Sequence, residues 1–505
     1  MTLRTGVRLL AAVAFFLVIS ALIVGRNVNR EVSRDEHLFV AGGALVSEGL
    51  LPYRDFPYLH MPYQALLFGA LFRVLSYKLL TARLATTLCA VAALLLVFWL
   101  ARTLSRGQRS PGPVLLPAAS VLLIVANPFF IVASGRAWNH DLPVLLTLGA
   151  FVSHYRGLMW QWRWGVLLSG VLLGAAVGSR IVFALAVIPF AAVIVLHERR
   201  SGGAVGRSLA VFAAGMTLSL LPVGVLAALN VEKFMFDNIG YFLLNAEWRR
   251  VTGYPEAMTL PAKVRYLLVD LRAGPGAAAL VLASVVCAGL RPAPFSARMP
   301  RDLGLLFAWL VTGVLFAGAF VNTPVFSQYF YAPVPFLVLA CAFAVASLDQ
   351  GTRQRVGLSF LVLVVLISGR DALPRYRRVA NPVAPSTWAA LQSHALGRLI
   401  AERVGGGRVL TLAPIAPVEG GAGIYAEFAP GPFAWRSAGL LPRERRRALG
   451  LIAAPDLSDY LADRPPDGIL VGYEGDLEDP LADYAMAHGY RAVRLPGGKT
   501  LWVHP

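Results

Sequence analysis

Two adjacent carboxylates, Asp35 and Glu36, are the first residues in this chain that could carry chemistry. They belong to the cluster Arg34-Asp35-Glu36-His37, which follows the first long apolar segment almost at once. A carboxylate costs about 2.5–3.5 kcal/mol at the centre of a membrane helix but little at the membrane edge. The pair could therefore be solvated loop acids, or it could supply a general base at a membrane surface. We favour the general base, because the chain has only 28 acidic residues against 46 Lys and Arg.

A second polar segment, 135–143, precedes a later apolar run. His140 and Asp141 stand directly before that run, with Pro143 in what would be its first helical turn. Asn139 or Asp141 in such a place is ordinary N-cap chemistry. Capping does not exclude catalysis, so Asp141 stays a candidate catalytic carboxylate.

Two isolated arginines, Arg136 and Arg180, lie between apolar runs where other charges are scarce. An arginine can bind a phosphate group through two parallel hydrogen bonds, although at an interface it can also simply snorkel to water. Gln328 and Tyr329 open a later apolar run. An aromatic belt explains the tyrosine without function, whereas the glutamine is less readily explained.

The composition indicates which kind of protein must position these side chains. Of 505 residues, 57% are hydrophobic and 15% are charged, which is typical of a polytopic membrane protein. The net charge of +18 is better explained by cationic loops that orient membrane helices than by nucleic-acid binding. The three cysteines lie inside apolar runs, which argues against a disulfide framework or a structural zinc: Cys89, Cys287 and Cys341.

About eleven apolar segments approach the roughly twenty residues that cross a bilayer. They lie at 7–25, 79–101, 113–134, 142–155, 164–178, 181–196, 208–229, 276–290, 303–320, 329–348 and 356–369. A cytoplasmic N-terminus then puts two or more arginines on every cytoplasmic loop, as the positive-inside rule requires.

The same rule decides the role of the apolar stretch 61–77. A span there would invert every later loop, so we expect an interfacial helix on the outer surface. The loop 26–60, the loop 135–141 and the turn 322–328 then share the extracytoplasmic side with the tail. The candidate residues would therefore gather at one membrane surface.

The tail is polar and rich in Pro, Gly and Arg. Its short apolar runs and the stretches between them predict strands at 407–412 and 467–472 and helices at 386–403 and 479–488. We expect a membrane domain over 1–369 and an extracytoplasmic α/β domain over 370–505. We find no Walker loop, GxSxG or HExxH motif in the sequence.

Taken in order, these residues resemble the GT-C superfamily of integral-membrane glycosyltransferases, especially bacterial relatives of protein O-mannosyltransferases and of the lipid A aminoarabinose transferase. The resemblance covers roughly 1–370, and an aminoarabinose-type Lys-Pro-Pro is replaced by His60-Met61-Pro62, which puts that substrate class in doubt. The matching features are the Asp35-Glu36 pair, the run from Glu48 to Pro57, the Arg83-bearing second span, Asn139-His140-Asp141, and Gln328-Tyr329 before a Pro-containing helix.

The resemblance implies a bacterial inner-membrane hexosyl- or pentosyltransferase with a polyprenyl-phosphate sugar donor. Asp35 would be the general base on a lipid, glycan or protein acceptor, with inversion at the sugar. Glu36 or Asp141 would orient the acceptor or, with Asp35, hold a divalent metal; metal dependence is left open. The remaining roles are donor-phosphate binding by Arg136, Arg180, His60 and Gln328, and acceptor binding or orientation by His37, His140 and Tyr329.

Two other functions remain open at this point. A transporter or flippase for a lipid-linked saccharide would favour polar residues and broken helices at the membrane midplane, whereas the acids here lie at one surface. A surface-polysaccharide polymerase or ligase also uses lipid-linked substrates, but relies more on large outer loops with Arg and His.

Overall fold

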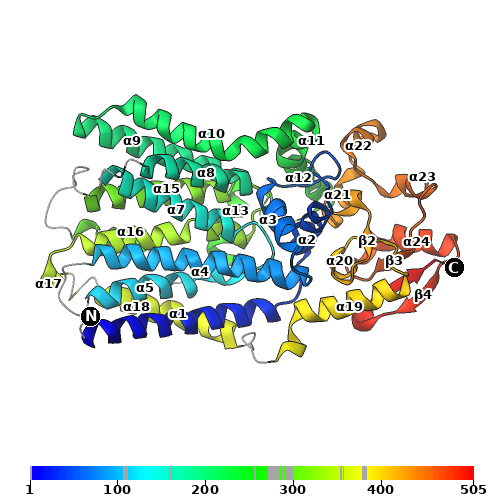
Figure 1. Cartoon of the computed structure of the whole chain (residues 1–505), viewed down its shortest axis with the longest axis horizontal. Helices are drawn as coiled ribbons and strands as arrows, with labels where there is room; N and C mark the ends of the chain where they lie inside the picture. The colour runs from blue at the N-terminus through cyan, green and yellow to red at the C-terminus, as the bar shows by residue number, and fades with distance from the viewer. Residues whose placement is uncertain are drawn as a thin grey trace.

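The computed structural model describes residues 3–105, 112–159, 162, 164–254, 258–270, 281–282, 284–286, 288–290, 300–352, 355, 358–377 and 384–504. Long helices lie side by side in a bundle, and a smaller unit with the five described strands adjoins one end of it (Figure 1). The N-terminus lies at the opposite end of the bundle (Figure 1). The polytopic helical architecture expected from the sequence is confirmed.

In the described part of the chain, six helical segments are long and apolar enough to cross a membrane. They are α1 (Leu3–Asn29), α4 (Lys78–Leu104), η1 with α9 (Ile181–Ala186, Val187–Ser201), α10 (Val205–Leu229), α15 (Pro300–Ala319), and η4 with α16 (Ser327–Tyr331, Val334–Ala346). The bundle also contains α5 (Gly112–Val125), α6 (Pro128–Ala133), α7 (Asp141–Met159), α8 (Gly165–Ser179) and α18 (Leu358–Arg377). Each expected span thus coincides with helix, except that about half of 276–290, including Cys287, lies outside the described residues, so the number eleven stays a prediction.

Small residues bring the bundle helices together. A Cβ on Gly170 of α8 would lie 2.1 Å from the Phe212 carbonyl oxygen of α10, and a Cβ on Gly215 would lie 2.3 Å from the Leu167 carbonyl oxygen. Only glycine permits this approach, which is how membrane helices without a hydrophobic driving force gain contact.

The segment 26–60 is not the loop that the sequence suggested. It contains a 14-residue helix, α2 (Arg34–Ser47), which begins with a capping box between Ser33 and Glu36. Its middle is buried against α3 (Tyr63–Phe72), and Gly43 makes room for Phe68 of that helix. A polar first turn hid a helix whose remaining residues are apolar. As expected, α3 itself is too short to span a bilayer, since 10 residues of helix are about 15 Å long.

A helical connection follows α10 and reaches the tail. It consists of α11 (Val231–Met235), η2 (Phe236–Gly240), α12 (Tyr241–Val251), α13 (Leu260–Arg265) and η3 (Tyr266–Asp270). Of these, α12 packs against α21 (Pro432–Ala438) of the tail.

The tail contains the strands and helices that the sequence predicts. Its five-stranded sheet has the order β2-β1-β3-β5-β4, with β1 parallel to β2 and β3, and β5 antiparallel to β3 and β4. The strands are β1 (Arg408–Leu410), β2 (Gly423–Ile424), β3 (Gly468–Val471), β4 (Arg491–Arg494) and β5 (Thr500–Val503). The helices include α19 (Ala389–Arg403), α20 (Ile415–Gly420), α22 (Arg443–Leu449), α23 (Leu457–Leu461) and α24 (Asp479–Ala487). The expected domain boundary at 369/370 falls inside α18, which continues to Arg377.

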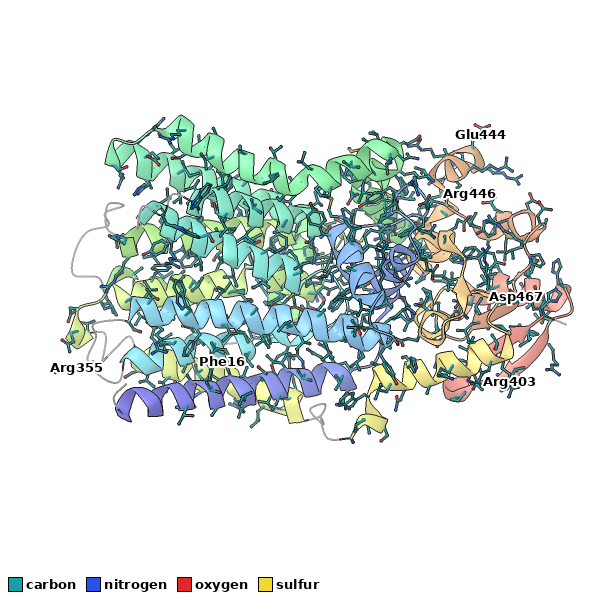
Figure 2. All side chains as sticks on the ribbon, in the orientation of Figure 1. Phe16, Arg355, Arg403, Glu444, Arg446 and Asp467 are labelled. Atoms are coloured by element: carbon teal, nitrogen blue, oxygen red, sulfur yellow. The ribbon has the colours of Figure 1, made fainter. Side chains whose placement is uncertain are left out.

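The tail is fixed to the bundle by specific contacts at the start of α4. Lys78 Nζ donates to the Val418 carbonyl oxygen at 2.9 Å, and the Leu79 N–H donates to the Glu419 carboxylate. Figure 2 shows Arg403 and Asp467 in the tail and Arg355 at the far end of the bundle. Arg355, from the expected cytoplasmic loop 349–355, is thus remote from the end that carries α2 and the tail.

Candidate active site

The first turn of α2 directs four consecutive side chains to different parts of the protein, because successive residues of a helix are about 100° apart. Arg34 Nε donates to Glu474 Oε1 of the tail at 2.8 Å. His37, one turn later, accepts a 3.2 Å hydrogen bond from the Ile415 N–H of the tail at Nδ1. Burial lowers the pKa of His37 to about 4, so the ring is neutral and can accept this bond. His37 therefore anchors the tail to α2.

Glu36 points into the bundle and is saturated with donors. Arg83 of α4 donates from Nε to Oε1 and from Nη2 to Oε2, both at 2.8 Å. The Ala137 N–H donates to Oε1 at 2.8 Å and the Ser33 N–H to Oε2 at 2.9 Å. Burial alone would raise the pKa of Glu36, but Arg83 and the other donors lower it to about 2. Glu36 is thus a positioning residue that ties α2, α4 and the segment 135–141 together.

Asp35 differs from Glu36 in its exposure and in its partners. It is only partly buried, and its carboxylate has no hydrogen-bond or ion-pair partner among the residues that the structure describes. Burial raises the pKa of Asp35, whereas the positive charges of Arg136, Arg436 and Arg180 lower it. An unpartnered carboxylate close to three arginines can accept a proton or orient a polar ligand.

Arg136 lies between the two carboxylates. Its Nη1 is 3.6 Å from Glu36 Oε2, and its guanidinium lies over the Trp138 ring at 5.3 Å. Its Nε is buried without a hydrogen-bond partner in the described residues. Arg136 therefore retains donor capacity beside Asp35.

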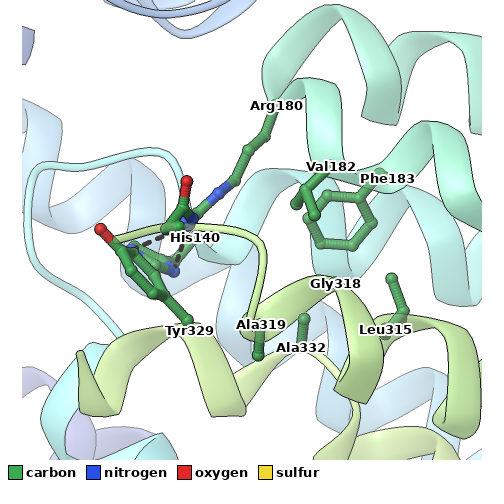
Figure 3. A pocket seen from close by; sticks show the side chains of 10 residues that line it. His140, Arg180, Val182, Phe183, Leu315, Gly318, Ala319, Tyr329 and Ala332 are labelled. Carbon is green, nitrogen blue, oxygen red and sulfur yellow. Dashed lines mark hydrogen bonds between the residues drawn. The ribbon is translucent and has the colours of Figure 1, made fainter. Parts of the chain in front are cut away.

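Arg180 forms the polar end of a pocket (Figure 3). Its Nη1 donates to Nδ1 of His140 at 2.7 Å, and its guanidinium lies over the Tyr329 ring at 5.1 Å. Burial, and then Arg180 itself, keep the pKa of His140 well below its usual range, so that ring is a neutral acceptor. The wall beyond is mostly apolar and includes Val182, Phe183, Leu315, Gly318 and Ala319. A cationic end on an apolar wall suits an amphiphile with an anionic head.

The remaining predicted phosphate ligands occupy different surroundings. His60 is partly exposed, stacks on Phe39 with ring centroids 5.0 Å apart, and has its pKa lowered to about 3 by burial and by Arg180. It is thus neutral and near the Arg180 pocket. Gln328 is half-buried on η4 and makes no hydrogen bond within the described residues, so the structure does not connect it to either arginine.

Asp141 makes no contact with Asp35 among the interactions of the described residues. It is fully buried, and its two oxygens accept from the Gly135 N–H at 2.6 Å and from the Tyr331 hydroxyl at 3.1 Å. Gly135 has a φ of +73°, and a Cβ there would meet the Asn27 amide. Asp141 therefore holds the 135–141 turn in place, as a clamp rather than only as an N-cap.

The described residues contain no group of three or more His, Cys, Asp or Glu side chains that could hold a metal ion. Of the three carboxylates considered as metal ligands, Glu36 and Asp141 have both oxygens engaged, and Asp35 lies among arginines. The arginines around Asp35 thus favour an anionic ligand beside it over a metal cation.

Sequence reasoning did not assign three residues to this site: Tyr241 and Arg436, which interact electrostatically with Asp35, and Arg249, which interacts with both of them. Tyr241 and Arg249 lie on α12, and the charge of Asp35 acts on Tyr241. Arg436 comes from α21 of the tail. The spacing of Tyr241 and Arg249, two helical turns apart with charge between aromatics, was a usable signal. Nothing in the sequence pointed to Arg436, because its approach depends on how the tail docks.

No protein-family model and no curated protein sequence matches this chain. Two solved structures are similar to it along most of its length. ArnT from Cupriavidus metallidurans, bound to undecaprenyl phosphate, has a TM-score of 0.62 and 14% identity, covering 97% of this chain and 98% of that chain. The apo Archaeoglobus fulgidus oligosaccharyltransferase has a TM-score of 0.50 and 13% identity, covering 98% of this chain and 74% of that one. At such identities the likeness is one of fold.

Proposed function

We propose that this chain, which has the GT-C membrane fold of ArnT and the archaeal oligosaccharyltransferase, transfers a sugar from a polyprenyl-phosphate donor to an acceptor. The fold supports the reaction class, and the ArnT structure, bound to undecaprenyl phosphate, supports the kind of lipid carrier. The transferred sugar would be a hexose or pentose, and the acceptor a lipid, glycan or protein.

The observation that carries the proposal is the unpartnered carboxylate of Asp35 among arginines. Every other acid in the first turn of α2 or the 135–141 turn is already engaged, as Glu36 and Asp141 are. A general base needs a free lone pair, and an anion site needs hydrogen-bond donors that have no other partner. Asp35 meets the first condition and Arg136 the second.

In the proposed reaction, Asp35 takes the proton of an acceptor hydroxyl as its oxygen attacks the anomeric carbon. The bond from that carbon to the phosphate oxygen breaks, and the lipid phosphate leaves with the electron pair. Attack from the face opposite the leaving group inverts the sugar. Arg180 and Arg136 would stabilise the negative charge on the leaving phosphate, an electrostatic effect that can exceed that of the base.

The pocket at Arg180 supports a place for the donor. Its apolar wall could take the first part of a polyprenyl chain, and Arg180 could take the phosphate. His140 and Tyr329 orient the Arg180 guanidinium, so we now assign them to donor positioning rather than to acceptor binding. His60 stays a candidate neighbour of the phosphate.

The two ends of the bundle support an outward-facing site. Arg355, a cation of the kind that cytoplasmic loops carry, lies at the end remote from α2 and the tail (Figure 2). We therefore place the N-terminus in the cytoplasm and the site and tail on the extracytoplasmic face of a bacterial inner membrane.

The test is sugar transfer by purified protein in nanodiscs, supplied with a panel of polyprenyl-phosphate sugars and acceptors. We expect Asp35→Asn to lower the transfer rate by about 10²–10⁴-fold, the usual contribution of a general base. Glu31→Gln is the matched control, because it removes an exposed carboxylate four residues earlier in the sequence, outside α2, and should leave the rate unchanged. Full transfer by Asp35→Asn would refute the assignment of the base, and transport of the saccharide without transfer would favour a flippase.

A further inference from the structure

A second pair of cations, Arg249 and Arg436, meets where α12 packs against the tail, and the charge of Arg436 acts on Asp35. Arg249 is 8% exposed and belongs to a stripe on α12 with Tyr241 and Asn245, at intervals of four residues. Its guanidinium lies over the Tyr254 ring at 4.2 Å and the Phe326 ring at 5.4 Å. Stacking on two rings fixes the guanidinium plane while leaving its N–H edges available.

Arg436 of the tail meets this stripe. It is 9% exposed, donates to Asn245 Oδ1 at 2.8 Å, and lies over the Trp248 ring at 4.7 Å. The Arg249 guanidinium is 6.0 Å from the same Trp248 ring, so the indole adjoins both cations. Two arginines from parts of the chain almost two hundred residues apart in sequence are thus held rigidly against one aromatic platform.

Neither arginine is closely paired with an acid in the described part of the chain, although Arg436 acts electrostatically on Asp35 and Glu474. Within the described residues no carboxylate forms an ion pair with Arg249 or Arg436, and the Nε of each is buried without a hydrogen-bond partner. Arg436 also disfavours the charge on Arg249, so the two cations repel each other. Buried like charges with unused donors are costly unless an anion joins them.

We propose that Arg249 and Arg436 form a second phosphate site, separate from the donor site at Arg180, which holds a phosphoryl group of a substrate beside Asp35. Two guanidinium groups match the charge of a phosphate monoester, about −1.5 to −2, and offer paired donors to its oxygens. The phosphoryl group comes either from the acceptor or from the second phosphate of a diphosphate-linked donor. The inference deepens the proposed function, since it assigns part of a substrate to that same site.

The two phosphate sites adjoin at Tyr329, whose ring lies under Arg180 and which also acts electrostatically on Arg249, but their cations differ. The charges that act on Arg180 are those of Tyr329 and Asp35, whereas the largest charge effect on Arg249 comes from Arg436. Asp35 is acted on by both Arg180 and Arg436. The catalytic carboxylate would therefore stand between a donor phosphate and a second phosphate, which sets the direction from which a substrate can approach.

The experiment measures phosphate binding without any transfer reaction. Full-length protein in detergent is saturated with undecaprenyl phosphate to fill the donor site, and its thermal unfolding is followed while inorganic phosphate is added, with chloride at equal ionic strength as the reference. We expect a saturable rise in the unfolding temperature, because a ligand that binds only the folded state stabilises it. Arg249→Gln and Arg436→Gln should each weaken the apparent affinity about tenfold or more, the loss expected for a charged hydrogen-bonding pair.

Arg447→Gln is the matched control, because it removes the same charge from an exposed position on α22 of the tail. Phosphate binding by Arg436→Gln with wild-type affinity, or no saturable binding by the wild type, would overturn the proposal, whether or not sugar transfer has been detected. Repeating the titration with undecaprenyl diphosphate in place of undecaprenyl phosphate identifies which substrate supplies the phosphoryl group. Loss of phosphate binding assigns the site to the donor's second phosphate, and continued binding assigns it to the acceptor.

Discussion

Two clusters of charge lie at the same end of the molecule, one residue apart in sequence, and they are built in opposite ways. Around Glu36, each carboxylate oxygen accepts hydrogen bonds from donors at 2.8–2.9 Å, which include Nε and Nη2 of Arg83. Around Asp35, the charges of Arg136, Arg180 and Arg436 converge, but none of the described residues donates a hydrogen bond to the carboxylate. A satisfied charge holds the architecture, whereas an unsatisfied one is available to a substrate.

The largest effect should come from breaking the satisfied cluster. Glu36→Gln leaves the guanidinium of Arg83 buried at 0% exposure without its counter-charge, so we expect about 3–5 kcal/mol less stability. Because the folded state lowers the pKa of Glu36 from 4.5 to about 2, its stabilisation is present above about pH 4.5 and lost as the pH falls through about 2. Thermal unfolding of full-length protein measures this loss.

The matched variant is Asp35→Asn, which removes the neighbouring charge from a side chain with no partner in the described residues. Its stability should stay within about 1 kcal/mol of the wild type, the range of substitutions that break no buried contact. Equal losses in Glu36→Gln and Asp35→Asn would show that the two clusters do not differ as the structure indicates.

The next largest effect concerns Arg180, one of the arginines around the unpaired Asp35 carboxylate. Arg180→Gln removes the cation at the end of the pocket, and we expect undecaprenyl phosphate to bind about 10–100-fold more weakly, the value of about 1.5–3 kcal/mol for a charged hydrogen bond. Binding by the purified protein is the measurement, with Arg355→Gln at the far end of the bundle as the control. Wild-type affinity in Arg180→Gln would place the donor phosphate elsewhere.

Much of the architecture could be predicted from the sequence because its signals are local. Apolar runs of bilayer length predicted the helices, and the short apolar runs near 409 and 469 became β1 and β3. The choice of Asp35 as the catalytic acid stays a prediction, made because it follows the first span so closely. The helix α2 was missed, because charge in its first turn concealed the apolar residues from Leu38 to Val46.

The roles of the charged residues could not be predicted, because each depends on a distant partner. Glu36 and Arg83 are 47 residues apart, and His37 meets Ile415 across 378 residues. Adjacent residues on a helix point about 100° apart, so the proximity of Asp35 and Glu36 in sequence said nothing of a shared task. Such contacts arise from packing, which single-sequence patterns do not contain.

A smaller effect concerns the acidity of Asp35. A general base works only when deprotonated, so transfer should fall as the pH drops through the pKa of Asp35, which burial raises above the ordinary value of about 3.9. Arg136 lowers that pKa, and Arg136→Gln should therefore move the acid limb of the pH–rate profile to higher pH. The exposed Arg447→Gln should leave the limb in place. A limb that moves to lower pH in Arg136→Gln would separate Asp35 from the reaction.

The smallest effect tests whether the contact between the tail and α2 supports the paired cluster around Glu36 or the unpaired one around Asp35. Arg34 pairs with Glu474 at 2.8 Å; Arg34 is 50% exposed but Glu474 only 5%, so Arg34→Ala should cost about 1 kcal/mol of stability, the upper end of the range for exposed ion pairs. Because the capping box and Arg83 already fix the first turn of α2, we expect transfer to fall less than about tenfold. Thermal unfolding and transfer rates of the same preparation measure both. A large loss of transfer with unchanged stability would mean that the tail, through Arg34, positions the carboxylate of Asp35.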